Sequence, residues 1–156
     1  DLASVTKISA TMAALMKLHD EGKFSEDATL GDYLPRFRRS NKKDIPLYDI
    51  LTHQGRLEPW IPFWKDLRRK NGSYKWFTIK RDSSRRYPIK VAPDMYLHRN
   101  YPDKILNIIR KSPLQEKKEY KYSDFFFILA PRIVENISEE KFEDFLQKNF
   151  YESLGG

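Results

Sequence analysis

The chain has 156 residues, of which 40% are hydrophobic, 14% aromatic and 33% charged, so it can bury a sizeable core and is not predicted to be disordered. It contains no cysteine, which excludes disulfides, thiolate metal sites and cysteine nucleophiles, and no apolar run approaches the ~18 residues that a membrane-spanning helix needs. The net charge of +7 is concentrated in residues 36–90, where 16 lysines and arginines accompany 5 acidic residues, whereas the remainder has a net charge of −4. The chain begins at Asp1 and carries no basic-then-apolar leader, so we expect an interior piece of a longer protein, with any targeting signal outside it.

The first predicted element is a helix over residues 4–21, because apolar side chains recur there at three- and four-residue steps. No charged residue lies between Lys7 and Lys17, so we expect this helix to be buried on most of its sides. Short helices are predicted next over residues 29–33, ending before Pro35, and over residues 47–52.

Residues 56–100 contain four prolines and little helical periodicity, so they predict loops, short helical turns and a small hairpin. Helices are then predicted over residues 101–111 and 125–135. A final amphipathic helix follows, with Ser138 expected to cap its start. The pattern is mainly helical, and no repeat or low-complexity linker indicates a second domain.

Ser4 and Lys7 form a Ser-x-x-Lys motif at the start of the uncharged helix. A serine hydroxyl needs a neighbour to accept its proton, and a lysine three residues on lies on the same helix face. Buried near other cations, such a lysine can lose its proton near neutral pH, and N–H groups at the helix N-terminus can stabilise an oxyanion. The spacing alone fits a helix cap at Ser4 equally well, and it recurs at Ser40/Lys43 and Ser138/Lys141 in charged segments.

The stretch from Ser4 to Leu15 resembles the active-site helix of the serine β-lactamase and penicillin-binding-protein family, closest to its class C-like esterase and D-alanyl-D-alanine peptidase branch. The similarity continues through three further segments, which are Leu18–Ser25, Leu30–Pro35 and Ile50–Gly55. The last of them resembles a Leu-Leu-Thr-His-Thr-Ser-Gly segment that is largely structural in the family. We therefore interpret His53 as a satisfied loop or core residue and not as a catalytic one.

Tyr122-Ser123-Asp124 is similar to the second family motif, Tyr-x-Asn, with aspartate in place of asparagine. The resemblance implies that Tyr122 moves protons between serine, lysine and leaving group, and that Asp124 contacts the substrate. An ionised aspartate cannot donate the hydrogen bond that asparagine gives to a substrate carbonyl, which implies a different substrate or altered binding. An alternative register aligns Ser123-Asp124-Phe125 with the Ser-Asp-Asn motif of class A enzymes.

The resemblance covers residues 1–57 and about 120–156, and residues 58–119 look like a basic insertion within a single partial domain, 1–156. The third family motif, Lys-Thr-Gly or His-x-Gly, is absent. The implied fold class is therefore mainly α: the helical half of the family's α+β fold, with most of the sheet missing. The implied arrangement needs no cofactor and no metal, and it depends on the missing segments or on another chain for completion.

The implied function is a serine hydrolase that acts on an ester or amide, such as a peptidoglycan peptide, a β-lactam or a small ester, at the periplasm or cell surface. One alternative is a non-catalytic binding module on the same scaffold. Another is a nucleic-acid-binding domain that uses the basic middle of the chain, although no recognised nucleic-acid motif accompanies the charge. His19, His53 and His98 are too scattered to predict a metal site.

Overall fold

The computed structural model describes residues 3–155, so Asp1, Leu2 and Gly156, the ends of the predicted domain, lie outside the described residues. The chain divides into two compact units, of which unit 1 comprises Asp1–Pro59 with Pro113–Gly156 and unit 2 comprises Trp60–Ser112. Unit 2 lies inside the segment that the sequence marks as a basic insertion. The interpretation of residues 1–156 as one domain with an insertion stays a prediction.

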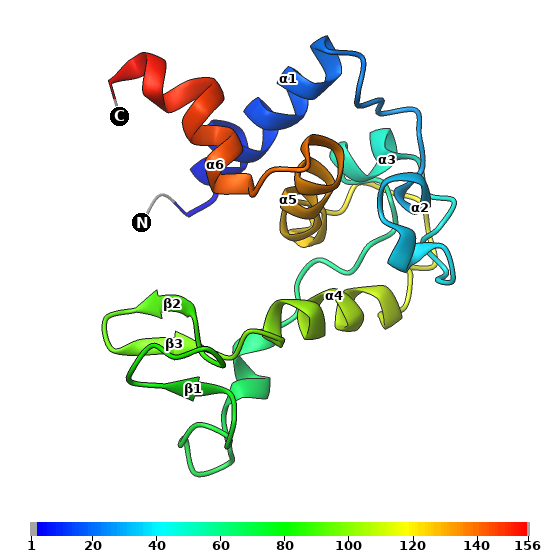
Figure 1. Cartoon of the computed structure of the whole chain (residues 1–156). Helices are drawn as coiled ribbons and strands as arrows, with labels where there is room; N and C mark the ends of the chain where they lie inside the picture. The colour runs from blue at the N-terminus through cyan, green and yellow to red at the C-terminus, as the bar shows by residue number, and fades with distance from the viewer. Residues whose placement is uncertain (1–2, 156) are drawn as a thin grey trace. The chain divides into compact units, whose positions relative to one another are not determined.

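Unit 1 is helical, and its first helix runs from a π-helical turn, Lys7–Met12, directly into α1, Ala13–Asp20 (Figure 1). The predicted helix therefore forms, and its inner face is buried at Ala10, Ala14 and Leu18. The expectation that it is buried on most sides is wrong. The side chains of Val5, Ile8 and Met16 are 53%, 68% and 62% exposed, because α5 and the C-terminal helical turns pack against only one side of this helix.

Helix α5, Phe125–Ser138, forms the centre of unit 1 and contacts α1, α2 (Leu30–Tyr33) and α6 (Phe142–Leu146). Six of its apolar side chains are buried, namely those of Phe125, Phe126, Leu129, Ala130, Ile133 and Val134. Pro131 lacks an N–H group to bond the preceding turn, yet the helix continues because its buried face is packed on several sides.

The remaining α-helix among the described residues of unit 1 is α3, Leu47–Leu51, which follows Pro46 as the sequence predicts. Helix α2 begins with a capping box, in which Asp32 accepts a hydrogen bond from the Thr29 N–H at 2.8 Å. The starts of these two short helices are hydrogen-bonded to each other, since the N–H of Leu47, the first residue of α3, donates to the carbonyl of Ala28 at 2.9 Å.

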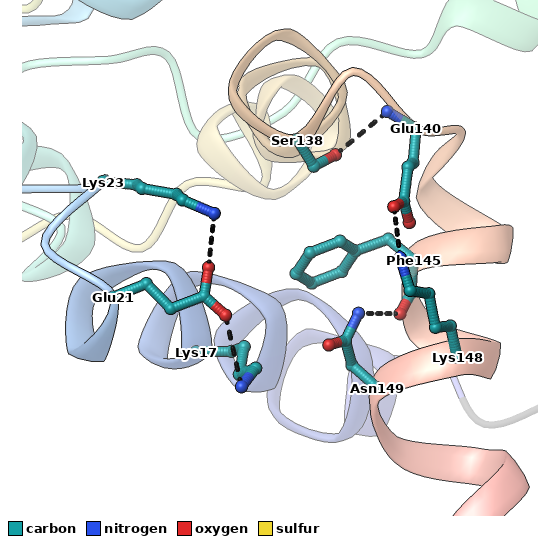
Figure 2. Close-up of polar contacts among 8 residues, drawn as sticks. All are labelled: Lys17, Glu21, Lys23, Ser138, Glu140, Phe145, Lys148 and Asn149. Carbon is teal, nitrogen blue, oxygen red and sulfur yellow. Dashed lines mark hydrogen bonds and ion pairs between the residues drawn. The ribbon is translucent and has the colours of Figure 1, made fainter.

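Ser138 does not cap the last helix, so that prediction is wrong. It is the final residue of α5, and its Oγ accepts a hydrogen bond from the Glu140 N–H at 3.2 Å (Figure 2). Glu139, at a φ of 61°, turns the chain out of α5, and Lys141 precedes the first turn of α6. Figure 2 also shows the ion pair that stabilises the following turn, in which Lys148 contacts Glu140 at 2.6 Å.

Unit 2 contains a small antiparallel sheet in the order β1-β3-β2, followed by one longer helix, α4. The strands are β1, Ile79–Lys80; β2, Ile89–Ala92; and β3, Met95–Leu97. β2 and β3 form the hairpin that the sequence predicts, and α4 spans Tyr101–Lys111 as expected. The predominance of helix therefore holds for the chain, with a minor sheet confined to this unit.

A lysine of the basic stretch over residues 36–90, Lys42, is buried in unit 1. The side chain of Lys42 has no exposed surface, and its Nζ donates to Asn41 Oδ1 at 2.9 Å. Burial lowers the pKa of Lys42 to about 8, against the opposing effect of the negative charge of Glu58. The folded state therefore carries the cost of a desolvated charge at neutral pH.

We expect Lys42→Met to raise the free energy of unfolding by about 2 kcal/mol at pH 7, since each unit of pKa depression corresponds to about 1.4 kcal/mol and lost hydrogen bonds offset part of the gain. Below pH 8 the buried ammonium lowers the free energy of unfolding of the wild type by its full amount. This loss disappears as the pH rises towards the pKa of the unfolded state, so the stability advantage of the variant should shrink between pH 7 and pH 9.5. Thermal unfolding across this range measures the difference. Lys43→Met, at an exposed neighbour, should change little; an equal gain there would contradict the assignment.

Candidate active site

The four residues that the sequence singles out lie together in unit 1. Lys7 Nζ donates a hydrogen bond to Ser4 Oγ at 3.1 Å, and the Tyr122 hydroxyl lies 3.5 Å from the same Oγ. Lys7 Nζ also forms an ion pair with Asp124 Oδ1 at 2.8 Å. The spacing of the first two residues places them one helical turn apart, whereas the fold brings Tyr122 and Asp124 to them from a position more than 110 residues along the chain.

Ser4 is not a helix cap. The N-cap residue of the first helical turn is Thr6, which makes no side-chain capping hydrogen bond, and the hydroxyl of Ser4 contacts Lys7 and Tyr122 instead. The preceding residue, Ala3, has a φ of 43°, a left-handed conformation that an alanine rarely adopts. Strained backbone of this kind is concentrated at functional sites, where surrounding structure holds it in place.

The other two Ser-x-x-Lys pairs are not built in this way. Ser40 Oγ donates to the carbonyl of Phe37 at 2.8 Å, and Ser138 Oγ accepts a hydrogen bond from the Glu140 N–H. Within residues 3–155, the hydroxyl of neither serine contacts the amine of the lysine that follows it at this spacing. In the described part of the chain, the Ser4 pair alone combines the spacing with a second hydroxyl at contact distance.

The electrostatics of Lys7 differ from the sequence-based expectation. Burial lowers its pKa, but the hydrogen bonds of Asp124 and Tyr122 and the charge of Asp124 outweigh burial, so the pKa of Lys7 is raised above the ordinary lysine value. The expectation that nearby cations would depress it is wrong, because the nearest charged group is a carboxylate. At rest the site holds a serine hydroxyl beside an ammonium group.

His53 holds the segment that carries Tyr122. Its Nδ1 accepts a hydrogen bond from the Ser123 N–H at 3.2 Å, and its carbonyl accepts one from the Lys121 N–H at 2.8 Å. The imidazole ring lies 4.5 Å from the Tyr122 ring, centroid to centroid. Burial, together with the positive charge of Lys7, lowers the pKa of His53 against the opposing effect of Asp124, so Nδ1 stays unprotonated and able to accept at neutral pH.

His53 is a hydrogen-bonded loop residue, as the sequence predicts, but no sequence pattern connected it with Tyr122. A second residue that the sequence patterns missed is Phe127, whose ring lies 5.5 Å from Lys7 Nζ. Both residues lie in or beside family-like segments, which is the signal that could have identified them. Their contacts join residues about 70 and 120 positions apart, so no local pattern predicts them.

A pair of substitutions tests the support from His53. His53→Leu should lower the free energy of unfolding by about 1–3 kcal/mol, because the buried Ser123 N–H then loses its acceptor. His53→Asn should retain most of the stability, since asparagine offers an acceptor oxygen and tolerates the φ of 59° found here. Urea unfolding of both variants measures the difference. Equal losses would show that the hydrogen bond to Ser123 contributes nothing.

Among residues 3–155, no group of three or more histidine or acidic side chains is arranged to hold a metal ion. Within the same residues, no helix is long and apolar enough to cross a membrane.

The family model described as Beta-lactamase matches residues 1–156, and the chain belongs to that family. It is 28% identical over 163 residues to an Escherichia coli (strain K12) protein that bears the name of a D-alanyl-D-alanine carboxypeptidase, with 99% of this chain and 32% of that protein covered. It is 27% identical over 160 residues to a Bacillus subtilis (strain 168) protein named N-acetylmuramyl-L-alanine amidase, with 99% and 31% covered.

Among solved structures, the fold is similar to that of a D-stereospecific amidohydrolase from Streptomyces sp., with a TM-score of 0.66, 17% identity, and 97% of this chain and 41% of that chain covered. The chain spans about a third of the length of the two named relatives. Its helices correspond to the helical portion of a β-lactamase-like fold, as the resemblance implied.

Proposed function

We propose that this chain supplies the nucleophile and the proton-transfer groups of a serine hydrolase. The observation that carries the proposal is the hydrogen bond of 3.1 Å between Lys7 Nζ and Ser4 Oγ, with the Tyr122 hydroxyl at 3.5 Å on the same oxygen. A hydroxyl flanked by a titratable amine and a phenol has a route for its proton, which a serine nucleophile requires. Membership of the beta-lactamase family supports this chemistry.

The proposed reaction begins when Lys7 has lost its extra proton. Ser4 Oγ then attacks the carbonyl carbon of an ester or amide while its proton passes to Lys7 Nζ, and the carbonyl oxygen takes the negative charge. Collapse of this intermediate breaks the bond to the leaving group, which receives a proton through Tyr122, and leaves an acyl group on Ser4. Water then releases the acid by the same proton route in reverse.

We propose a peptidoglycan-type peptide as the substrate, because the two named relatives carry the names of a D-alanyl-D-alanine carboxypeptidase and an N-acetylmuramyl-L-alanine amidase. Such a substrate lies outside the cytoplasmic membrane, so we place the reaction at the periplasm or cell surface. Asp124 would contact the substrate. As a carboxylate it accepts hydrogen bonds and cannot donate them, which favours a substrate N–H or an ammonium at that position.

The test is the intact mass of the chain after exposure to a fluorophosphonate probe and, separately, to a penicillin. We expect one phosphonyl adduct on the wild type and none on Ser4→Ala. Ser138→Ala serves as the matched control, since it removes the serine of another Ser-x-x-Lys pair, and it should keep the adduct. An adduct that persists in Ser4→Ala, or no adduct either on this chain or on a longer protein that contains it, would contradict the proposal.

A second function, a non-catalytic binding module, is favoured by one observation. The ion pair of 2.8 Å between Asp124 and Lys7 stabilises the ammonium form of the lysine, which cannot accept a proton. In that case Ser4 would remain unlabelled at every pH at which the chain is folded. The same mass measurement, repeated at pH 7 and pH 10, separates the two functions.

A further inference from the structure

Unit 2 carries a basic hollow, a surface pocket of about 440 Å³. Its six lining residues are Trp64, Lys65, Arg68, Arg69, Lys70 and Gly72. Four of them are cations and none is acidic. All six residues belong to unit 2, and none belongs to the candidate active site.

The positive charge of the basic hollow is not neutralised by the protein. Within residues 3–155, no ion pair includes Lys65, Arg68, Arg69 or Lys70, and the nearby carboxylate of Asp66 pairs instead with Lys75 and Lys104. Unit 2 as a whole has 14 lysines and arginines against 4 acidic residues. A concave site with four uncompensated cations is suited to an anion, since the arginines can bind phosphate oxygens in pairs.

The ring of Trp64 lines the basic hollow, and the ring of Trp76 lies beside its Arg69. The Trp64 and Trp76 side chains are 52% and 73% exposed, and Phe77, which follows Trp76, is 67% exposed. The Arg69 guanidinium lies 5.6 Å from the Trp76 ring centroid, and Lys65 Nζ lies 5.7 Å from that of Trp64. Large aromatic side chains exposed to water beside cations are unfavourable in the isolated protein. They therefore indicate a partner that has a charged surface with an apolar layer beneath it.

The rings and cations are fixed relative to one another by the backbone of this segment. Arg68 pairs with Tyr74 in an antiparallel bridge, and the Lys75 N–H donates to the Leu67 carbonyl at 2.7 Å. The turn between them passes through Gly72 at a φ of 82°. The cations therefore lie on a loop whose backbone is held by hydrogen bonds.

We propose that the basic hollow of unit 2 docks on a bilayer surface that bears anionic phospholipid headgroups, with a headgroup phosphate in the hollow and the neighbouring indoles in the interfacial layer. At such a surface the cations bind the anionic headgroups and the tryptophans bind the interfacial layer, so both residue types favour docking. A single-stranded nucleic acid fits less well. A single strand needs a groove long enough for about four or more nucleotides and aromatic ring faces that are free for base stacking. The lining residues of the basic hollow all lie within residues 64–72, and cations lie near the Trp64 and Trp76 rings.

The three tryptophans of the chain, Trp60, Trp64 and Trp76, all lie in unit 2, so selectively excited tryptophan fluorescence reports on this unit alone. We expect vesicles of phosphatidylcholine with 30% phosphatidylglycerol to shift tryptophan emission to the blue and to protect it from acrylamide. Pure phosphatidylcholine vesicles should do neither, and added salt should weaken the binding. No shift with the anionic vesicles, or an equal shift with both kinds of vesicle, would overturn the proposal.

The variant Arg68→Gln/Arg69→Gln/Lys70→Gln should bind the anionic vesicles about a hundredfold more weakly, since each cation near an anionic leaflet contributes about fivefold. The matched control, Arg39→Gln/Lys117→Gln/Lys141→Gln, removes three exposed cations from unit 1 and should bind like the wild type. Circular dichroism confirms that both variants are folded. Equal weakening in both would show a diffuse charge effect, and tighter binding of a single-stranded oligonucleotide than of vesicles would show a nucleic-acid surface. Either result overturns the proposal.

Discussion

Replacing Lys7 with glutamine should slow the covalent labelling of Ser4 by about 10²–10⁴-fold, the usual contribution of a positioned acid–base group. Glutamine keeps a polar side chain of similar reach, but it has no group that takes up a proton at any accessible pH. Lys7 Nζ is the nearest titratable group to Ser4 Oγ, at 3.1 Å, so its loss removes the first acceptor in the proposed route. The rate of fluorophosphonate labelling, followed by intact mass, measures the effect.

The matched control for this experiment is Lys17→Gln, which lies further along the same helix and pairs with Glu21 at 3.2 Å. It should label at the wild-type rate, because its surface ion pair contributes about 1 kcal/mol or less to stability. Tyr122→Phe provides a second comparison, since it removes the hydroxyl and keeps a ring that can pack on His53. A Lys7→Gln rate within threefold of the wild type would assign the base to another group.

Periodicity predicted the helices of this protein because burial along a helix follows a local rule. Residues 7–20 and α5 both have apolar side chains at helical spacing, and both form helices. The extent to which each side chain is buried does not follow from the local sequence. Ile8 and Met16 have the same apolar character as the buried Leu15, and the elements packed against this helix decide which of them is covered.

The candidate site was predictable to the extent that it follows from spacing and from family-like motifs. Ser4 and Lys7 lie one turn apart on a helix, so their contact follows from helical geometry. The family resemblance placed Tyr122 and Asp124 in the same site, and the structure brings them there. Their distances from Ser4 and Lys7, and the support from His53, depend on how segments far apart in sequence pack, which no local pattern contains.

Ser138 shows the opposite case, in which a local rule was applied to the wrong element. A serine followed by two acidic residues is typical of a helix start, but α5 continues three residues beyond its predicted end and includes it. Apolar packing extended the helix through Pro131, and the left-handed Glu139 ended it. Tertiary contacts therefore decided the boundary, whereas propensity would have ended the helix earlier.

Asp124→Asn should make Ser4 label faster at pH 7–8. The aspartate raises the pKa of Lys7 through a hydrogen bond and its negative charge, so its removal lowers that pKa. A lysine with a lower pKa is deprotonated to a larger extent at a given pH, roughly tenfold for every unit while the ammonium form predominates. The labelling rate of the wild type should therefore rise with pH through the raised pKa of Lys7, and the variant should reach the same plateau at lower pH.

The measurement is the labelling rate between pH 6 and pH 10 for the wild type, Asp124→Asn and Asp49→Asn. The last variant removes the carboxylate of a different lysine ion pair, Lys118–Asp49 at 2.7 Å, and should leave the profile unchanged. The Lys7–Asp124 pair is partly exposed, with 19% and 35% of the two side chains accessible, so its loss should cost about 1 kcal/mol or less and leave the fold intact. A profile that stays in place, or moves to higher pH, would mean that labelling does not depend on deprotonation of Lys7. In that case Asp124 acts only on the bound substrate, and the proton of Ser4 leaves by another path.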